Sequence, residues 1–184
     1  MMFHGYKATT KDIDLVFKSA KDRNVFIKAV EKLGYSQRSL KQVYEGERLK
    51  SENKPLLYSR GEERFDLFVT DVFGFEIDFE KFVQRHDYIG EKELTIFTAP
   101  KELLIILKSI TNREKDYEDI ETIVKLGKNV DWKAILDIAI SKRKQMPWIL
   151  IDLEEKMNLL KKTVLIKKEN FDRIYEAQSK RLIK

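Results

Sequence analysis

Apolar and polar residues follow two different periods along the chain. Up to about residue 99, short apolar runs with a period of two predict strands, because successive side chains of a strand point to opposite faces. In the clearest of these runs Arg64, Asp66 and Phe68 share one face, and the residues between them form an apolar face. The predicted strands are residues 13–17, 56–59, 64–70, 73–79 and 94–97, with 73–79 as the hairpin partner of 64–70.

Helical periodicity appears once in this first part and then dominates the rest of the chain. Residues 21–33 place apolar side chains at i, i+3, i+4 and i+7 from Phe26, and Gly34 follows as a stop. Pro100 suits the first position of a helix, and the helical period continues from there toward the C-terminus. The later predicted helices span residues 116–126, 149–166 and 171–183, with one more that Asp131 would cap.

Strands with helices, followed by helices alone, predict an α+β fold with a small mixed sheet, flanking helices and an all-helical C-terminal part. The expected domains are residues 1–98 as an α/β core, 99–145 as a helical part of the same domain and 146–184 as a basic helical extension. Residues 141–184 hold 12 Lys or Arg and 6 Asp or Glu, whereas the whole chain has a net charge of only +5. This basic tail suits an acidic partner such as RNA, or it is a solvated helix face.

Composition narrows the class of protein more than its function. The 184 residues are 42% hydrophobic, which is enough for a core, and they include no cysteine, which excludes disulfides and thiolate sites. The charged fraction of 36%, mostly Lys and Glu, is typical of a thermophilic source. The chain has no apolar run near the roughly 18 residues of a membrane span and begins with no signal-peptide pattern, so we expect a cytoplasmic location.

Two aspartates at the start of the first predicted strand are the first candidates for chemistry. With a period of two, Asp12 and Asp14 face one side while Ile13 and Leu15 face the core. Adjacent carboxylates repel each other unless a cation lies between them, and Mg²⁺ prefers such oxygen ligands. Taken as a bare triplet, Asp-x-Asp is explained more simply as a solvent-facing strand edge without function.

The flanking residues change this interpretation. Residues 5–16, Gly-Tyr-Lys-Ala-Thr-Thr-Lys-Asp-Ile-Asp-Leu-Val, resemble nucleotidyltransferases of the polymerase-β-like superfamily, and more narrowly the AbiEii-type and related bacterial and archaeal members. A second motif, about a hundred residues later, resembles the helical signature of the same family. Its residues are Lys108, Arg113, Lys115, Asp116 and Asp119. The two motifs together cover roughly residues 1–145, so the expected sheet is of the nucleotidyltransferase type.

The resemblance implies a metal-dependent enzyme that uses a nucleoside triphosphate (NTP). Asp12 and Asp14 would hold the Mg²⁺ or Mn²⁺ ion that binds the triphosphate. Asp66 would supply a third carboxylate and help to activate an acceptor hydroxyl, and Asp78 is the alternative for this position. Two metal ions could then stabilise the attacking and the leaving oxygen of an in-line displacement.

The resemblance also implies positions that bind the nucleotide. These are Lys108, Arg113, Lys11 and Thr10. A lysine offers a compact charge to the triphosphate, and an arginine offers a fork that matches phosphate oxygens. The residues alone favour another interpretation, an ion-pair ladder in which Arg113 pairs with nearby carboxylates along a helix. With the resemblance, Lys108 is assigned to the nucleotide and Asp119 to the structure.

One element of the family pattern is missing. The family normally carries a Gly-Gly or Gly-Ser pair on a turn upstream of Asp-x-Asp, where glycine lets the backbone approach the phosphates. Gly5 corresponds to a later glycine of the family, so the pair would fall before Met1. We therefore expect either a start site further upstream or the loss of a phosphate-binding element, which would weaken or abolish catalysis.

Three functions follow as alternatives. The first is transfer of a nucleoside monophosphate to an RNA or protein hydroxyl, with a role in a toxin–antitoxin pair as one option. The second is a catalytically inactive homologue that binds a partner or RNA, and the third is RNA binding driven by the basic tail.

Trp132 and Trp148 are predicted as core or interface anchors rather than base-stacking platforms. The stripe of Leu153, Met157, Leu160 and Val164 is predicted as a packing surface or a homodimer surface rather than a ligand groove.

Overall fold

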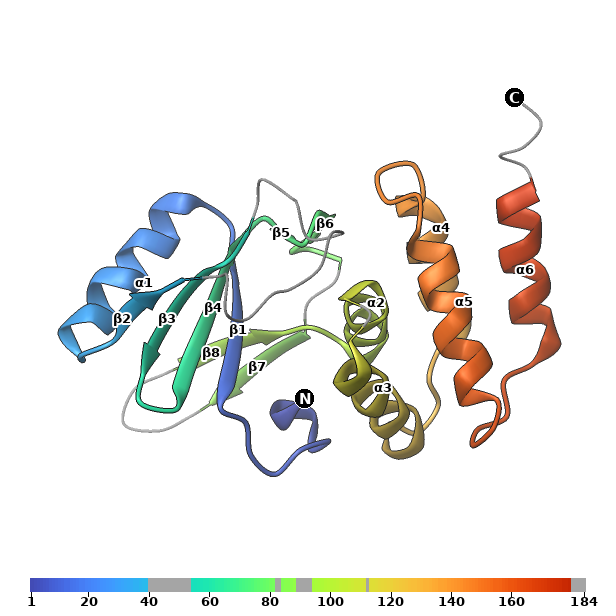
Figure 1. Ribbon diagram of the computed structural model, residues 1–184, viewed down its shortest axis with the longest axis horizontal. Helices are drawn as coiled ribbons and strands as arrows, with labels where there is room; N and C mark the ends of the chain where they lie inside the picture. The colour runs from blue at the N-terminus through green and yellow to red at the C-terminus, as the bar shows by residue number, and fades with distance from the viewer. Residues whose placement is uncertain (40–53, 82–83, 89–93, 112, 180–184) are drawn as a thin grey trace. The chain divides into compact units, whose positions relative to one another are not determined.

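The computed structural model describes residues 1–39, 54–81, 84–88, 94–111 and 113–179, and these residues form two units (Figure 1). One unit is Lys7–Phe79, and the other is Glu80–Lys184 together with Phe3–Tyr6. A short 3₁₀ helix, η1 (Met2–His4), stands at the start of the chain. Within the described ranges, no helix has both the length and the apolar character needed to cross a membrane.

The Lys7–Phe79 unit is built on a four-stranded mixed sheet. Its strands, in spatial order, are β1 (Asp12–Phe17), β4 (Glu63–Val69), β3 (Leu56–Arg60) and β2 (Ser36–Arg38). β1 runs parallel to β4, whereas β3 is antiparallel to both of its neighbours. A parallel pair needs a crossover connection, and the segment between β1 and β2 supplies a helix that lies along the sheet (Figure 1).

Helix α1 (Ala20–Lys32) covers one face of this sheet and closes the core of the unit. Ser19 caps its first turn by accepting a hydrogen bond from a backbone amide at 3.2 Å. Gly34 ends the helix with φ of +86°, a conformation that side chains disfavour. The helix buries Ile27 and Val30 against Leu67 of β4, so the apolar face of β4 is the core face of the sheet.

Most predicted elements of this unit are confirmed, but the predicted hairpin is wrong. Instead of pairing with β4, the following residues form a separate ribbon of β5 (Asp71–Val72) and β6 (Phe75–Glu76). Both edges of β4 already bond to β1 and β3, so β4 has no edge left for a hairpin partner. Asp71 closes the ribbon locally, because its Oδ1 accepts a hydrogen bond from the amide of Gly74 at 2.8 Å.

The sequence pattern predicts neither β2 nor β7 (Gln84–Tyr88), which pairs antiparallel with β8 (Leu94–Thr98). Both of these unpredicted strands consist mainly of polar residues and show no apolar alternation. Such strands form because a neighbour offers backbone partners, a tertiary effect that overrides local propensity.

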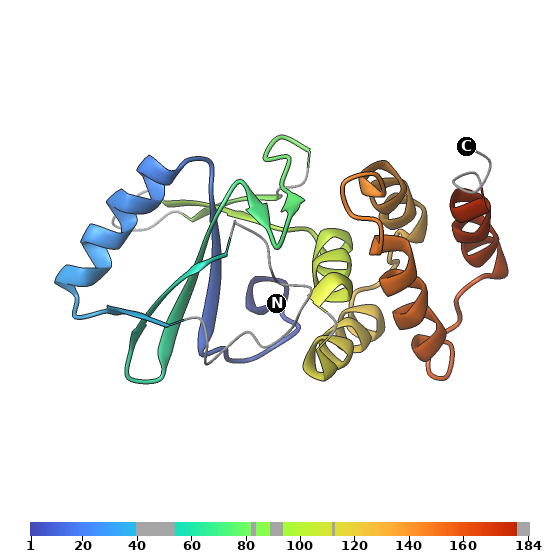
Figure 2. The ribbon, with the colours of Figure 1, turned by 45° about the horizontal axis from the view of Figure 1, so that its top comes forward.

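The Glu80–Lys184 unit is mainly helical. Its helices are α2 (Lys101–Thr111), α3 (Glu114–Leu126), α4 (Trp132–Lys142), α5 (Ile149–Leu160) and α6 (Lys168–Ser179). Helix α2 packs against α3, α4 and α5, while α6 packs against α4 and α5 (Figure 2). This helical part after a mixed sheet confirms the predicted α+β class. The predicted division of the helical part at residue 145 stays a prediction.

The predicted helix 149–166 is too long. Helix α5 ends at Leu160, where the β-branched Thr163 and Val164 follow in a turn rather than in a further helical turn. Helix α6 then begins before the predicted residue 171, and residues 180–183 of that prediction lie outside the described residues. Leu153, Met157 and Leu160 are buried, so this part of the predicted stripe packs inside its own unit, whereas Val164 lies beyond the end of α5.

We expect Leu67→Ala to lower the free energy of unfolding of the Lys7–Phe79 unit by about 2 to 5 kcal/mol, because it opens a cavity in the core. The matched change Leu33→Ala should cost less than about 0.5 kcal/mol, since Leu33 is 62% exposed and Leu67 is fully buried. Hydrogen exchange of the β3 and β4 amides measures the stability of this unit directly. Equal losses from the two variants would contradict this assignment of the core.

Candidate functional site

The parallel pairing of β1 with β4 brings the predicted carboxylates side by side. In this register Asp14 is the partner of Asp66, and Asp12 is the partner of Arg64. Paired residues of neighbouring strands point to the same face, and the alternate residues of both strands pack against α1. The four side chains therefore share the sheet face opposite α1.

The four side chains differ strongly in their exposure to solvent. The side chain of Asp66 is 1% exposed and that of Asp12 is 37% exposed, while Asp14 is an exposed residue. The expectation that Ile13 and Leu15 both face the core is half right. Leu15 packs against the core cluster, but Ile13 is 44% exposed because β1 lies at one edge of the sheet order.

Arg64 joins two of the three carboxylates. Its Nε donates a hydrogen bond to Oδ1 of Asp66 at 2.8 Å, and its Nη2 donates to Oδ2 of Asp66 at 3.4 Å. The same Nη2 lies 2.9 Å from Oδ2 of Asp12. The alternation of residues 64–70 places Arg64 on this face but by itself assigns it no role. The overlooked signal is Arg-x-Asp within one strand, a spacing that puts a guanidinium beside a carboxylate.

These residues fit a divalent cation in kind and in register. Carboxylate oxygens are the ligands that Mg²⁺ and Mn²⁺ prefer. In the arrangement seen, however, no three acidic or histidine side chains among the described residues lie close enough to hold a metal ion. The guanidinium of Arg64 supplies the positive charge between Asp12 and Asp66 instead.

The remaining candidates of this unit lie around the start of β1 or beyond the sheet. Thr10 Oγ1 donates to the carbonyl of Asp12 at 2.8 Å and so fixes the backbone where the strand begins. Lys11 forms an exposed ion pair with Glu62 at 2.6 Å. Asp78 follows the β5–β6 ribbon and is not on β4, so the strand register favours Asp66 as the third carboxylate.

The second motif forms a buried ion-pair network between α2 and α3. Lys108 Nζ lies 2.6 Å from Oδ2 of Asp119 and 3.4 Å from Oδ1 of Asp116. Asp116 Oδ2 also accepts hydrogen bonds from Arg113 Nε and Thr111 Oγ1, both at 2.6 Å. Asp116 and Asp119 are buried, so these bonds hold the two helices together. This network belongs to the Glu80–Lys184 unit, whereas Asp12, Asp14 and Asp66 belong to the Lys7–Phe79 unit.

The network changes the acidity of Asp116. Burial by itself raises the pKa of this carboxyl, but the hydrogen bonds from Arg113 and Thr111 and the nearby positive charges of Lys108 and Arg113 outweigh burial. The pKa of Asp116 is therefore lower than its ordinary value of 3.8. The carboxylate stays charged in the folded protein, as an ion-pair partner must.

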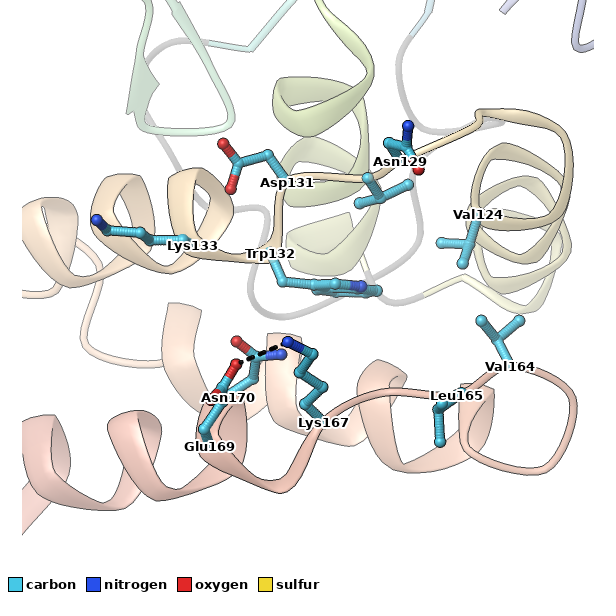
Figure 3. A pocket seen from close by; sticks show the side chains of 11 residues that line it. Val124, Asn129, Asp131, Trp132, Lys133, Val164, Leu165, Lys167, Glu169 and Asn170 are labelled. Atoms are coloured by element: carbon cyan, nitrogen blue, oxygen red, sulfur yellow. Dashed lines mark ion pairs between the residues drawn. The ribbon is translucent and has the colours of Figure 1, made fainter.

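A separate cavity of about 420 Å³ opens in the helical unit (Figure 3). The indole of Trp132 forms one wall, and Lys167 and Asn170 stand across from it (Figure 3). The Nζ of Lys167 lies 3.5 Å from Oε1 of Glu169, and Asn170 is buried. Trp132 therefore lines an open cavity and does not lie fully in the core. The first of its two predicted roles, that of a core anchor, required full burial.

The profile of one protein family matches residues 1–175, and the description of that family is "Nucleotidyltransferase of unknown function (DUF6036)". A comparison with curated proteins found no match. The match covers both motifs and both units, and it confirms the resemblance at the level of the superfamily. The narrower resemblance to AbiEii-type members stays a prediction.

We expect Asp116→Asn to lower the free energy of unfolding by about 3 kcal/mol at neutral pH, because it removes the negative charge from a buried ion-pair network. The matched variant Asp137→Asn removes an exposed ion pair with Arg173 and should cost less than about 1 kcal/mol. Urea denaturation followed by tryptophan fluorescence reports on this unit, since Trp132 and Trp148 both lie in it. Equal costs for the two variants would argue against a structural role of the network.

The same variant tests the pH dependence. A lowered folded pKa contributes stability above the ordinary value of 3.8, and this contribution is lost as the pH falls through the folded pKa. The wild type should therefore lose stability on the acid side below about pH 4. Asp116→Asn should lack this part of the decline, whereas Asp137→Asn should keep it.

Proposed function

The chain belongs to this nucleotidyltransferase family, and we propose that it transfers a nucleoside monophosphate from an NTP to a hydroxyl group of RNA or protein. The proposal rests on one observation above all. Asp14 and Asp66 are partners across a parallel strand pair, and Asp12 lies two residues from Asp14 on the same face. Three carboxylates on one face repel one another, and a bound cation relieves this repulsion.

The proposed reaction needs Mg²⁺ or Mn²⁺ at these carboxylates, and nucleotidyltransferases generally use divalent metals. Asp12, Asp14 and Asp66 would hold the ion, which would supply positive charge to the triphosphate oxygens. The acceptor oxygen forms a bond to the α-phosphorus, and the bond from this phosphorus to the bridging oxygen of the β-phosphate breaks. Pyrophosphate leaves with the electron pair, and the hydroxyl proton passes to a carboxylate, for which Asp66 is proposed.

Lys11 and Thr10 of the Lys7–Phe79 unit are proposed to bind the nucleotide. Lys11 is exposed next to Asp12, and its pair with Glu62 is weak enough to exchange for a phosphate. Thr10 would support this contact by holding the strand start in place. Lys108 and Arg113 would have to give up part of their contacts with Asp116 to bind phosphate, so they are proposed with that cost.

A second function is favoured by the cavity beside Trp132. An aromatic wall with Lys133 and Lys167 nearby suits a nucleobase next to its phosphates, because bases stack on aromatic rings and lysines attract the backbone. In this alternative the chain binds RNA or another partner without catalysing transfer. The toxin–antitoxin role that the resemblance allows is compatible with either function.

The first test is calorimetric titration of the four NTPs in the presence and absence of Mg²⁺. We expect Mg²⁺-dependent binding in the wild type and at least about tenfold weaker binding in Asp12→Asn/Asp14→Asn, because removing two carboxylates removes the ligands of the cation. The control is Asp137→Asn/Asp172→Asn, which removes the same charge from the helical unit and should bind NTPs like the wild type. Equal binding in the two double variants would reject the proposed site.

The RNA-binding alternative is tested with Trp148→Phe, which leaves Trp132 as the one indole because the chain has two tryptophans. If the alternative holds, a short single-stranded RNA quenches its fluorescence, and added salt weakens the binding steeply. In this background Lys167→Gln should weaken binding several-fold, whereas Lys162→Gln, which changes an exposed lysine that does not line the cavity, should not. Absence of quenching at any RNA concentration would reject this role for the cavity.

A further inference from the structure

Arg64 occupies the position of a cation within the proposed active site. We propose that Arg64 is a displaceable internal counterion, which holds Asp12 and Asp66 in the metal-free protein and competes with the divalent ion for them. This inference rests on the proposed function, because it takes the three carboxylates as the ligands of the ion. It adds a residue that neither family motif contains and that contacts oxygens proposed as metal ligands.

The geometry points to competition rather than to simple support. One guanidinium contacts both carboxylates, with Nε 2.8 Å from Asp66 Oδ1 and Nη2 2.9 Å from Asp12 Oδ2. Those oxygens are among the ligands proposed for the metal ion. A cation that approaches the same lone pairs replaces the hydrogen bonds of Arg64, and the positive charge of the guanidinium repels a cation at any other lone pair of these oxygens.

Electrostatics explains why the site holds an arginine. Three carboxylates on one face of two neighbouring strands repel one another, and Asp66 is almost fully buried, where an uncompensated charge is costly. A guanidinium offers a planar fork with several donors, so it can bond to two carboxylates at once, which a lysine cannot do with the same geometry. In the metal-free protein, Arg64 thus stabilises an acidic face that would otherwise strain the β1–β4 pair.

The two contacts of Arg64 are unequal, which sets the order of release. Asp66 accepts two hydrogen bonds from the guanidinium and is buried, whereas Asp12 has one contact and is 37% exposed. Water can replace the lost partner of Asp12 at little cost, but not that of Asp66. Asp12 is therefore released first and is the first carboxylate that the incoming ion can bind.

The test compares Arg64→Gln with Arg60→Gln. Glutamine keeps hydrogen-bonding capacity but removes the charge, and Arg60 is a matched control in the same sheet that pairs with Glu63 instead. We expect Arg64→Gln to bind Mn²⁺ at least about tenfold more tightly than the wild type, measured by electron paramagnetic resonance of free Mn²⁺, because the competing charge is gone. Without metal the same variant should melt at a lower temperature, and Mn²⁺ should raise its melting temperature more than that of the wild type. Arg60→Gln should leave the Mn²⁺ affinity unchanged.

A measurement on the unmodified side chain covers the case in which Arg64→Gln does not fold. The Nε–H signal of Arg64 in an ¹⁵N spectrum, assigned through Arg64→Lys, should shift or broaden when Mg²⁺ is added to saturation. Arg64→Lys keeps the charge but loses the fork, so its Mn²⁺ affinity should lie between that of the wild type and that of Arg64→Gln.

The outcomes separate this inference from the proposed function. If Mn²⁺ binding depends on Asp12 and Asp14 but is equal or weaker in Arg64→Gln, the metal site stands and the counterion role is overturned. An Nε–H signal that does not change at saturating Mg²⁺ overturns it as well. If neither the wild type nor Arg64→Gln binds Mn²⁺, the metal site itself is rejected, and the counterion role falls with it.

Discussion

The site depends on the parallel pairing of β1 with β4. These strands are far apart in the sequence, and only their register places Asp14 opposite Asp66 and Asp12 opposite Arg64. A shift by one residue would turn every side chain of β1 to the other face and separate the carboxylates. The register is held by the apolar faces of both strands, which α1 covers with Ile27 and Val30. The core on one face of the sheet therefore determines which side chains meet on the other.

Both units bury carboxylates, and both compensate them with a guanidinium close in sequence. Asp66 is bonded to Arg64 within one strand, and Asp116 is bonded to Arg113 at the entrance of a helix. The networks differ in what they connect. The bonds of Asp116 join two helices that pack on each other, so they serve the fold. The bonds of Arg64 join carboxylates that repel one another. They stabilise an acidic sheet face that lies opposite the core.

The sequence predicted the parts that follow from local pattern. Period-two alternation located β4 and placed Asp66 on it, helical spacing located α1, and the first motif selected Asp12 and Asp14 as candidates. It did not predict β2 or β7, because polar strands are specified by their neighbours rather than by their own residues. It assigned a hairpin partner to β4, because nothing local reveals that both edges of that strand are taken. The Arg-x-Asp spacing is a local signal for the pair of Arg64 with Asp66, but the second partner, Asp12, is adjacent only through the sheet.

Motif residues identify which atoms can bind a metal, but not whether they are available to it. In the proposed site the availability depends on a residue outside both motifs, because the charge that Asp66 needs when buried is already supplied by Arg64. A site with a built-in counterion gains stability without metal and gives up metal affinity in exchange. The weaker contact, to the half-exposed Asp12, is where that balance is most easily shifted. An acidic motif on a buried sheet face should therefore be read together with the cations that its neighbouring strands provide.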